Sequence, residues 1–184
     1  KEFRKILKSL ESYDEFSNEI ILKVLKAQME TLKKFNIKFD VLNRERDILL
    51  SGIFDECKEI LKKHNLCKEK ECLFVSFNGK EIPITRSDGT CLYLGKDIAF
   101  ALWKHGIIKK DFNYEKFNSS WITSIKGEKK NFSNVDISIN VIDVRQSDEQ
   151  KVVSYIIDKL SEKKKQYIHF GYEVVAISNN TAKA

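Results

Sequence analysis

The second half of the chain alternates strand and helix patterns, and this alternation constrains the fold more than any other feature. The predicted elements are a short strand at 91–94, a helix at 97–105, a strand at 137–144, a helix capped by Asp148 and a strand at 167–177. Parallel strands need a long crossover connection, and a helix commonly supplies it. The pattern therefore predicts an α/β fold with a parallel sheet and crossover helices.

The first third of the chain is predicted to be helical. Ser12 and Glu15 have the spacing of a capping box, in which each side chain meets a free backbone N–H. Apolar residues recur beyond them at near-helical spacing until Asn36 breaks the pattern. A short extended piece at 39–42 then precedes a second helix, predicted at 47–64 from its single apolar stripe.

A β-hairpin is predicted after this second helix. Two β-rich runs, at 73–77 and 82–85, are joined through Asn78-Gly79. This dipeptide favours a tight turn between strands, because both of its residues tolerate positive φ. Residues 107–134 show no clean period, so a long loop with short strands is expected there.

Composition supports a folded chain and leaves its partners open. Of the 184 residues, 42% are hydrophobic and 33% charged, which is enough apolar material for a core and argues against disorder. The net charge of +6 is compatible with nucleic acid but does not require it, because lysines commonly cover solvated helix faces. Four cysteines, at Cys57, Cys67, Cys72 and Cys91, match no paired zinc spacing and are expected to be reduced thiols, with no metal bound.

The sequence shows no targeting signal and no membrane-spanning segment. It has no apolar run long enough to span a bilayer and no signal peptide, so a cytoplasmic location without membrane contact is expected. The chain opens at Lys1 without an initiator methionine and closes without a tapering tail, so a piece of a longer protein is expected. Nothing in the sequence predicts an oligomer, and a monomer is expected.

No catalytic constellation stands out by spacing alone. The glycines form no phosphate-binding loop, and no serine lies in a nucleophile elbow. The histidines, His64, His105 and His169, are scattered along the chain and are expected at helix ends or in the core. The residues by themselves therefore predict a basic α/β domain without an assigned reaction.

One stretch resembles a known family. Ser87-Asp88-Gly89-Thr90, followed by Tyr93 and then by Asp97-Ile98-Ala99, is similar to the SDGT-x-x-Y-x-x-x-DIA stretch of arginyl-tRNA synthetases. Further similar segments occur in the family's order at Phe39-Asp40 with Glu45, at 140–147 and at 169–175. The family has a class I catalytic domain with a Rossmann fold, so the resemblance implies a partial Rossmann-like parallel sheet with a helical and β-hairpin insertion.

The resemblance also implies domains. Residues 1–38 would form a helical insertion segment, and residues 39–92 a helix and β-hairpin insertion of the catalytic domain. Residues 93–184 would form the second half of the Rossmann-like catalytic domain.

The resemblance implies a pocket for arginine. Tyr93 would pack against the bound arginine near its α-amino end, and Asp97 would face its guanidinium. Glu45 would be a second carboxylate for the guanidinium, and Gln146 would contact the amino-acid end. Carboxylates suit this ligand because a guanidinium is planar, permanently charged and rich in donors. Lysine cannot reproduce that geometry, which gives a route to discrimination.

Each of these residues also has a purely structural interpretation. Asp97 could cap a helix or interact with the helix dipole, and Tyr93 could be a core aromatic. Glu45, which lies between Arg44 and Arg46, could form a surface ion pair of small value, and Gln146 could be an unrelated polar residue. These alternatives remain open at the level of the sequence.

The implied activity is that of an arginine–tRNA ligase, with L-arginine, ATP with Mg²⁺, and tRNA(Arg) as substrates and partners. The family's HIGH-type and KMSKS-type motifs, which belong to the ATP site, have no match in the sequence. The chain by itself is therefore expected to be inactive and to hold no ATP or Mg²⁺. The alternative is a non-catalytic, synthetase-like module that binds RNA or regulates.

Overall fold

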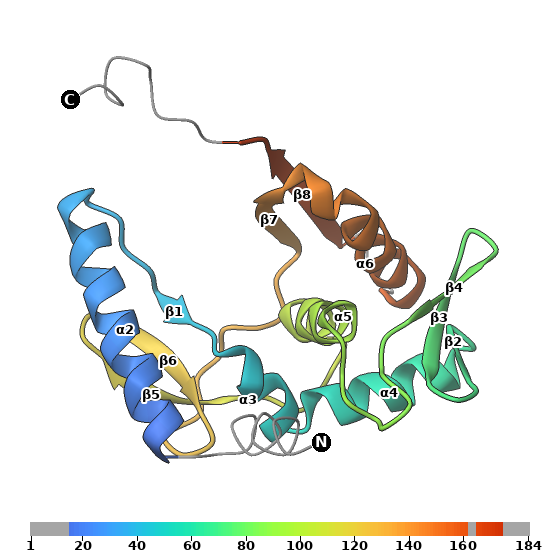
Figure 1. Cartoon of the computed structure of the whole chain (residues 1–184), viewed down its shortest axis with the longest axis horizontal. Coiled ribbons are helices and arrows are strands. Elements are labelled where there is room, and N and C mark those ends of the chain that lie inside the picture. The colour runs from blue at the N-terminus through green and yellow to red at the C-terminus, as the bar shows by residue number, and fades with distance from the viewer. Residues whose placement is uncertain (1–14, 162–164, 175–184) are drawn as a thin grey trace.

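The computed structural model describes residues 15–161 and 165–174, which form a mixed α/β fold of short sheets and connecting helices. The helices are α2 (Glu15–Lys34), α3 (Glu45–Leu50), α4 (Ile53–Lys63), α5 (Tyr93–Lys104), the 3₁₀ turn η1 (Val144–Gln146) and α6 (Ser147–Leu160). The strands are β1 (Val41–Leu42), β2 (Cys67–Glu69), β3 (Leu73–Phe77), β4 (Lys80–Pro83), β5 (Asn113–Phe117), β6 (Ser120–Ser124), β7 (Ile137–Asp143) and β8 (Gln166–Tyr172). Figure 1 shows α5 near the centre, with α2, β5 and β6 on one side and β2, β3 and β4 on the other.

The strand–helix–strand unit β7–α6–β8 confirms the predicted parallel pairing. β7 and β8 run parallel in register from Ile137↔Gln166 to Asp143↔Tyr172, and α6 makes the crossover between them. Buried side chains of α6 pack toward the sheet and α5: Val152, Val153, Ile156 and Ile157. Ile139, Val141 and Phe170 of the sheet are each 60% or more exposed, so the pair carries an apolar surface.

The predicted strand at 91–94 is wrong. Helix α5 already begins at Tyr93, and Cys91 forms only an isolated antiparallel bridge with Thr85. Leu94 and Ile98 extend the buried stripe of α5 back by one turn, which explains why the helix starts earlier than predicted. The described part of the sheet accordingly has two parallel strands and not three.

Gly95 allows this early start. A Cβ at Gly95 would lie 2.6 Å from the carbonyl oxygen of Ile84 and 2.9 Å from Sγ of Cys91. The first turn of α5 therefore approaches the end of the hairpin segment at a distance that only glycine permits.

The helix predicted at 47–64 is divided into α3 and α4. Gly52 adopts φ +73°, in the left-handed region, and stands between the two helices. A single glycine in this conformation ends one helix without strain and redirects the chain into the next. Both helices still contribute to the core, through Ile48 from α3 and through Phe54 and Leu61 from α4.

The hairpin prediction is confirmed and its sheet is larger than expected. Asn78 and Gly79 have φ values of 50° and 75°, as a tight primed turn requires, and Phe77 pairs with Lys80 across it. β2 adds a third antiparallel strand on the other side of β3. The region 107–134 contains the hairpin β5–β6, consistent with the expected loop with short strands, and β6 also pairs with β1.

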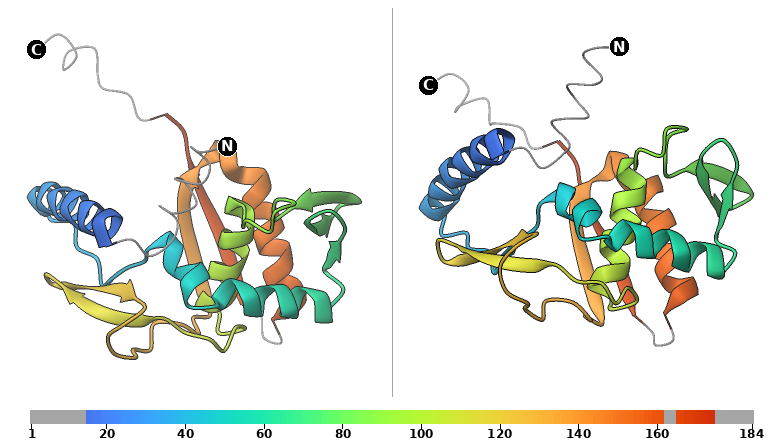
Figure 2. Two further views of the ribbon diagram at one scale, coloured as in Figure 1. Left: turned by 60° about the horizontal axis from the view of Figure 1, so that its bottom comes forward. Right: turned by 90° about the horizontal axis from the view of Figure 1, so that it is seen from below.

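Helix α2 is confirmed and lies apart from α4, α5 and α6, over the β5–β6 hairpin (Figure 2). It ends where Asn36 adopts φ 57°, the left-handed cap expected from the break in the pattern. Ser12 of the predicted capping box lies outside the described residues, as does the end of the strand predicted to reach residue 177. The α6 helix begins at Ser147, so Asp148 lies in its first turn and does not cap it.

Candidate functional site

Three of the predicted site residues come from two helix starts. Tyr93 begins α5, and Asp97 follows one helical turn later, so both lie on the same side of this helix. Glu45 begins α3, which packs against α5. The fourth residue, Gln146, ends the 3₁₀ turn η1 that follows β7.

Glu45 and Tyr93 line one hollow of about 620 Å³ between α2, α3 and α5. The apolar part of its wall is supplied by Ile20, Ile21, Val24, Leu25, Leu42, Leu49 and Ile122. Lys96 lies in the same hollow, with its Nζ 3.1 Å from Oε1 of Glu45 and 5.4 Å from the ring centroid of Tyr93. The hollow therefore already holds a cation between a carboxylate and an aromatic ring, supplied by the chain itself.

The neighbouring arginines, Arg44 and Arg46, both form ion pairs with Asp47. Arg44 donates from Nε to Oδ2 of Asp47 over 2.9 Å, and Nε of Arg46 lies 3.8 Å from Oδ1 of Asp47. Asp47 is 1% exposed and also accepts from the Thr123 hydroxyl over 2.7 Å. The predicted alternative of a surface ion pair is confirmed for Glu45, because its half-exposed side chain pairs with Lys96 within the hollow.

Tyr93 is not a core aromatic, because 77% of its surface is exposed. Asp97 is not a helix cap either, because α5 begins four residues before it. The core position of Tyr93 and the capping role of Asp97 are therefore both wrong. Tyr93 lines the hollow, whereas Asp97 is partly buried and does not line it.

Asp97 is an acid in an unfavourable place for a lone charge. Burial raises the pKa of its carboxyl, and the nearby charge of Glu45 raises it further. Lys104 and a hydrogen bond from Gln150 act in the opposite direction on the same pKa, and Glu149 adds to the increase. The structure thus brings Glu45 close enough to act on Asp97, and a bound cation would stabilise the ionised Asp97 carboxylate.

A polar network lies behind Asp97. Gln150 of α6 is 1% exposed, and its Nε2 donates to Oδ2 of Asp97 at 3.5 Å. Its Oε1 accepts from the Tyr167 hydroxyl of β8 over 2.6 Å. Asn140 of β7 contacts the same hydroxyl, and its Oδ1 accepts from Nζ of Lys104 over 3.0 Å. Residues of α5, α6, β7 and β8 therefore form the hydrogen-bond network around the Asp97 carboxylate.

Sequence reasoning missed Gln150, Asn140 and Tyr167, although a signal for two of them was present. Gln150 lies three residues before Val153 and seven before Ile157, on the buried stripe of α6. A polar residue on such a stripe must find hydrogen-bond partners, and this marks it as unusual. Asn140 alternates with Ile139 and Val141 in β7, and because parallel strands are commonly buried on both faces, a polar residue there also needs hydrogen-bond partners. Tyr167 gave no signal, because tyrosine is common in strands.

Gln146 is placed apart from the hollow. It is exposed, it precedes α6, and within the described residues its side chain forms no hydrogen bond. It does lie just beyond the carboxyl end of β7, the edge at which ligands bind in sheets of this type. Beside it, Arg145 lowers the pKa of the Asp143 carboxyl to about 2 through direct hydrogen bonds, which fixes the turn locally.

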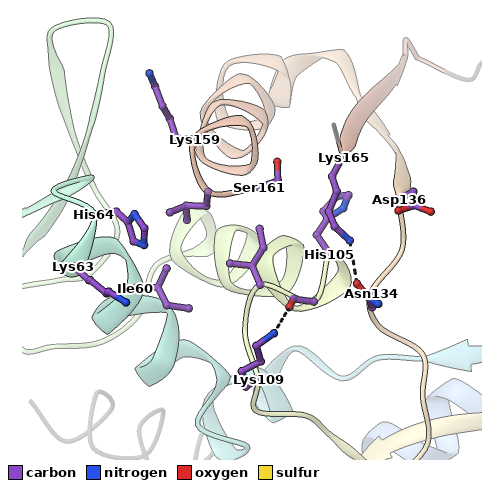
Figure 3. A pocket seen from close by; sticks show the side chains of 13 residues that line it. Ile60, Lys63, His64, His105, Lys109, Asn134, Asp136, Lys159, Ser161 and Lys165 are labelled. Atoms are coloured by element: carbon purple, nitrogen blue, oxygen red, sulfur yellow. Dashed lines mark hydrogen bonds between the residues drawn. The ribbon is translucent and has the colours of Figure 1, made fainter. Parts of the chain in front are cut away.

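A larger hollow of about 1040 Å³ lies at the opposite end of the fold (Figure 3). It is surrounded by the last turns of α4, α5 and α6, and its charged and titratable lining is Lys63, Lys109, Lys159, Lys165, His64, His105 and Asp136. Lysines at helix C-termini compensate the negative end of the helix dipole. A cation would be repelled here, so this hollow does not suit a guanidinium.

His105 in that wall is structural. Its ring nitrogens face the carbonyl oxygen of Val135 at 3.2 Å and the Ser138 hydroxyl at 2.9 Å, and burial lowers its pKa. His64 ends α4, as expected for a helix-end histidine. Within residues 15–161 and 165–174 no group of three or more His, Cys, Asp or Glu side chains is arranged to hold a metal ion. None of the described helices is long and apolar enough to cross a bilayer.

Comparisons with known proteins show the family of the chain. The profile described as "tRNA synthetases class I (R), catalytic domain" matches residues 1–176. The arginine–tRNA ligase of Pyrococcus furiosus is 35% identical over 95% of this chain, and that of Thermococcus sibiricus is 33% identical over 95%. The solved Thermus thermophilus arginyl-tRNA synthetase superposes with a TM-score of 0.73 at 25% identity, covering 85% of this chain and 30% of that one.

The fold and the profile define a class I tRNA synthetase catalytic domain. Within that class, the chain belongs to the arginyl-tRNA synthetase family. It spans about 31% of the length of these two curated relatives. The crystal structure of the Plasmodium falciparum arginyl-tRNA synthetase, 15% identical with a TM-score of 0.63, supports the same fold. These matches do not favour the alternative of a non-catalytic module.

Proposed function

We propose that the protein containing this chain is an arginine–tRNA ligase and that this chain provides its guanidinium pocket. The observation that carries the proposal is the pair of mutually repelling acids, Asp97 and Glu45, beside the exposed ring of Tyr93. Paired acids are costly to the fold unless a cation joins them. A guanidinium is the cation whose planar set of donors suits two carboxylates.

The proposed binding step is an exchange of cations. In the absence of ligand, Lys96 forms an ion pair with Glu45. This ion pair is weak because the Glu45 side chain is exposed to solvent. An incoming guanidinium would donate a hydrogen bond to one oxygen of Asp97 and would displace Lys96 from Glu45. Lysine as a competing ligand has one compact ammonium and cannot bridge two acids with the same geometry, which gives the pocket its selectivity.

The remaining roles follow from the positions of the side chains. Tyr93 offers an apolar face to the arginine stem and a hydroxyl toward its α-amino end. Gln146, at the carboxyl end of β7, would meet the amino-acid end only if arginine extends from the hollow toward that edge. Neither Gln146 nor Asp97 lines the hollow, but Asp97 is close enough to Glu45 for the Glu45 charge to raise its pKa.

The proposed reaction has two steps. The α-carboxylate of arginine attacks the α-phosphorus of ATP, and pyrophosphate leaves. A ribose hydroxyl of tRNA(Arg) then attacks the carbonyl carbon of the arginyl-adenylate, loses its proton and forms an ester, and AMP leaves. Mg²⁺ accompanies ATP. Because the HIGH-type and KMSKS-type motifs have no match in the sequence, residues outside this chain would bind ATP, and we expect the 184-residue chain alone to be inactive.

The test uses the product of the complete reading frame. Arginine-dependent ATP–pyrophosphate exchange is measured with and without tRNA, followed by charging of tRNA, with lysine and citrulline as comparison substrates. The proposal expects activity with arginine, and little with lysine or with citrulline, which is neutral. RNA binding without arginine-dependent exchange under either condition would instead identify a regulatory module. Charging of tRNA by the isolated chain would contradict its expected dependence on other residues.

A further inference from the structure

Gln150 stands out among the buried groups that the proposed reaction does not use. Its side chain is 1% exposed on the apolar stripe of α6, where a leucine or methionine would pack without needing partners. Burying an amide is unfavourable unless both of its ends form hydrogen bonds. Both ends of Gln150 do so, one with Asp97 of α5 and the other with Tyr167 of β8.

The hydrogen-bond chemistry gives this network a single direction. The Lys104 ammonium can only donate, so the Asn140 atom that it meets at 3.0 Å is the amide oxygen. The Asn140 amide nitrogen then faces the Tyr167 hydroxyl and donates to it. That hydroxyl donates its own proton to Oε1 of Gln150 over 2.6 Å. The Gln150 amide nitrogen is thereby turned toward Asp97.

The network ends at a group that can only accept. Ionised Asp97 has no proton to donate, so the donor from Gln150 matches it, and a reversed amide would set oxygen against oxygen. The contact involves Oδ2 at 3.5 Å, which is long for a hydrogen bond. It therefore orients the carboxylate more than it neutralises it, and the other oxygen, Oδ1, remains for a ligand.

We infer that Gln150 is a positioning residue, which holds the Asp97 carboxylate in the orientation that receives the arginine guanidinium. This inference rests on the proposed function, because it assigns Gln150 a part in the same pocket. Gln150 itself does not line the hollow that holds Glu45 and Tyr93, and it acts only through Asp97. The other charged groups that act on this carboxylate, Glu45, Lys104 and Glu149, come from α3, α5 and α6.

The test is a double-mutant cycle in the product of the complete reading frame. Gln150→Met keeps the length and packing of the side chain and removes both of its polar ends. We expect it to raise the KM for arginine about fivefold, less than loss of a short hydrogen bond to a charged group would, and to leave the KM for ATP unchanged. In the Asp97→Asn background, the same substitution should change the arginine KM less than twofold, because the carboxylate it positions is gone.

A merely structural role predicts a different result. Loss of packing would raise the arginine KM by the same factor in both backgrounds, or would raise the KM for ATP equally, and either outcome overturns the inference. Gln166→Met, on an exposed glutamine at the start of β8, is the matched control and should leave both constants unchanged. If the wild-type protein shows no arginine-dependent activity, the proposed function fails, which is a separate result.

A second variant decides the question if Gln150→Met does not fold. Tyr167→Phe keeps the aromatic packing and removes the nearer of the two donors to Oε1 of Gln150, the other being Nδ2 of Asn140 at 3.4 Å. It should raise the arginine KM about threefold, less than loss of the amide itself, and this rise should also vanish in the Asp97→Asn background. An arginine KM equal to that of the wild type would overturn the inference.

Discussion

Asp97→Asn separates a ligand-binding carboxylate from a structural one, because it should change affinity and stability in opposite directions. The substitution keeps the shape of the side chain and removes its charge. Burial raises the pKa of the Asp97 carboxyl, so the folded state disfavours the ionised form. The free energy of unfolding therefore falls as pH rises from the unfolded pKa, about 3.9, through the raised folded pKa.

The magnitudes follow from the same geometry. At neutral pH the ionised Asp97 makes the fold less stable, so Asp97→Asn should leave the melting temperature unchanged or raise it. Arginine binding should weaken, since a hydrogen bond to a charged group contributes about 1.5–3 kcal/mol, or about 10- to 150-fold in affinity. A residue that merely supports the helix would show the reverse: lower stability and unaltered arginine kinetics.

The assay measures the arginine KM in ATP–pyrophosphate exchange beside a thermal melt of the same preparation. The pH dependence gives a further check, because binding needs Asp97 ionised. The wild-type arginine KM should rise as pH falls, from a pH above that of an ordinary aspartate, and the Asn variant should lack this rise. An Asn variant with wild-type arginine KM and reduced melting temperature would refute the reasoning.

Three further substitutions test the surroundings of the site. Lys96→Met removes the internal cation from Glu45 and should lower the arginine KM by about 1.4- to 5-fold, since an exposed ion pair contributes about 0.2–1 kcal/mol. An unchanged KM would show that no exchange occurs. Asp47→Asn leaves the buried arginines without their acid and should lower the free energy of unfolding in urea by about 3–5 kcal/mol. Gly95→Ala places a Cβ 2.6 Å from a carbonyl oxygen and should cost about 1–3 kcal/mol in the same denaturation experiment, which wild-type stability would contradict.

The sequence predicted the elements whose signals are local. Asn78-Gly79 carries its turn preference in two residues, and the parallel pair β7–β8 follows from apolar alternation on either side of a helix. The predictions were wrong where the tertiary structure, and not the local sequence, determines where a helix begins or ends. The start of α5 depends on the close approach that Gly95 permits, and the break between α3 and α4 depends on the backbone of Gly52.

The candidate site likewise has residues that the sequence indicated and contacts that only the structure shows. The family resemblance indicated Tyr93, Asp97 and Glu45, and the structure places these near one another. No sequence pattern could show that Lys96 forms an ion pair with Glu45, because that pairing depends on how α3 packs against α5. The support behind Asp97 joins residues that are 53 and 17 positions apart, so only the fold reveals it.

The most direct test is a crystal structure of the complete protein with arginine bound. The account predicts guanidinium nitrogens within about 3 Å of the carboxylate oxygens of Asp97 and Glu45, with Lys96 turned away from Glu45. A guanidinium bound elsewhere, with Lys96 still on Glu45, would contradict it.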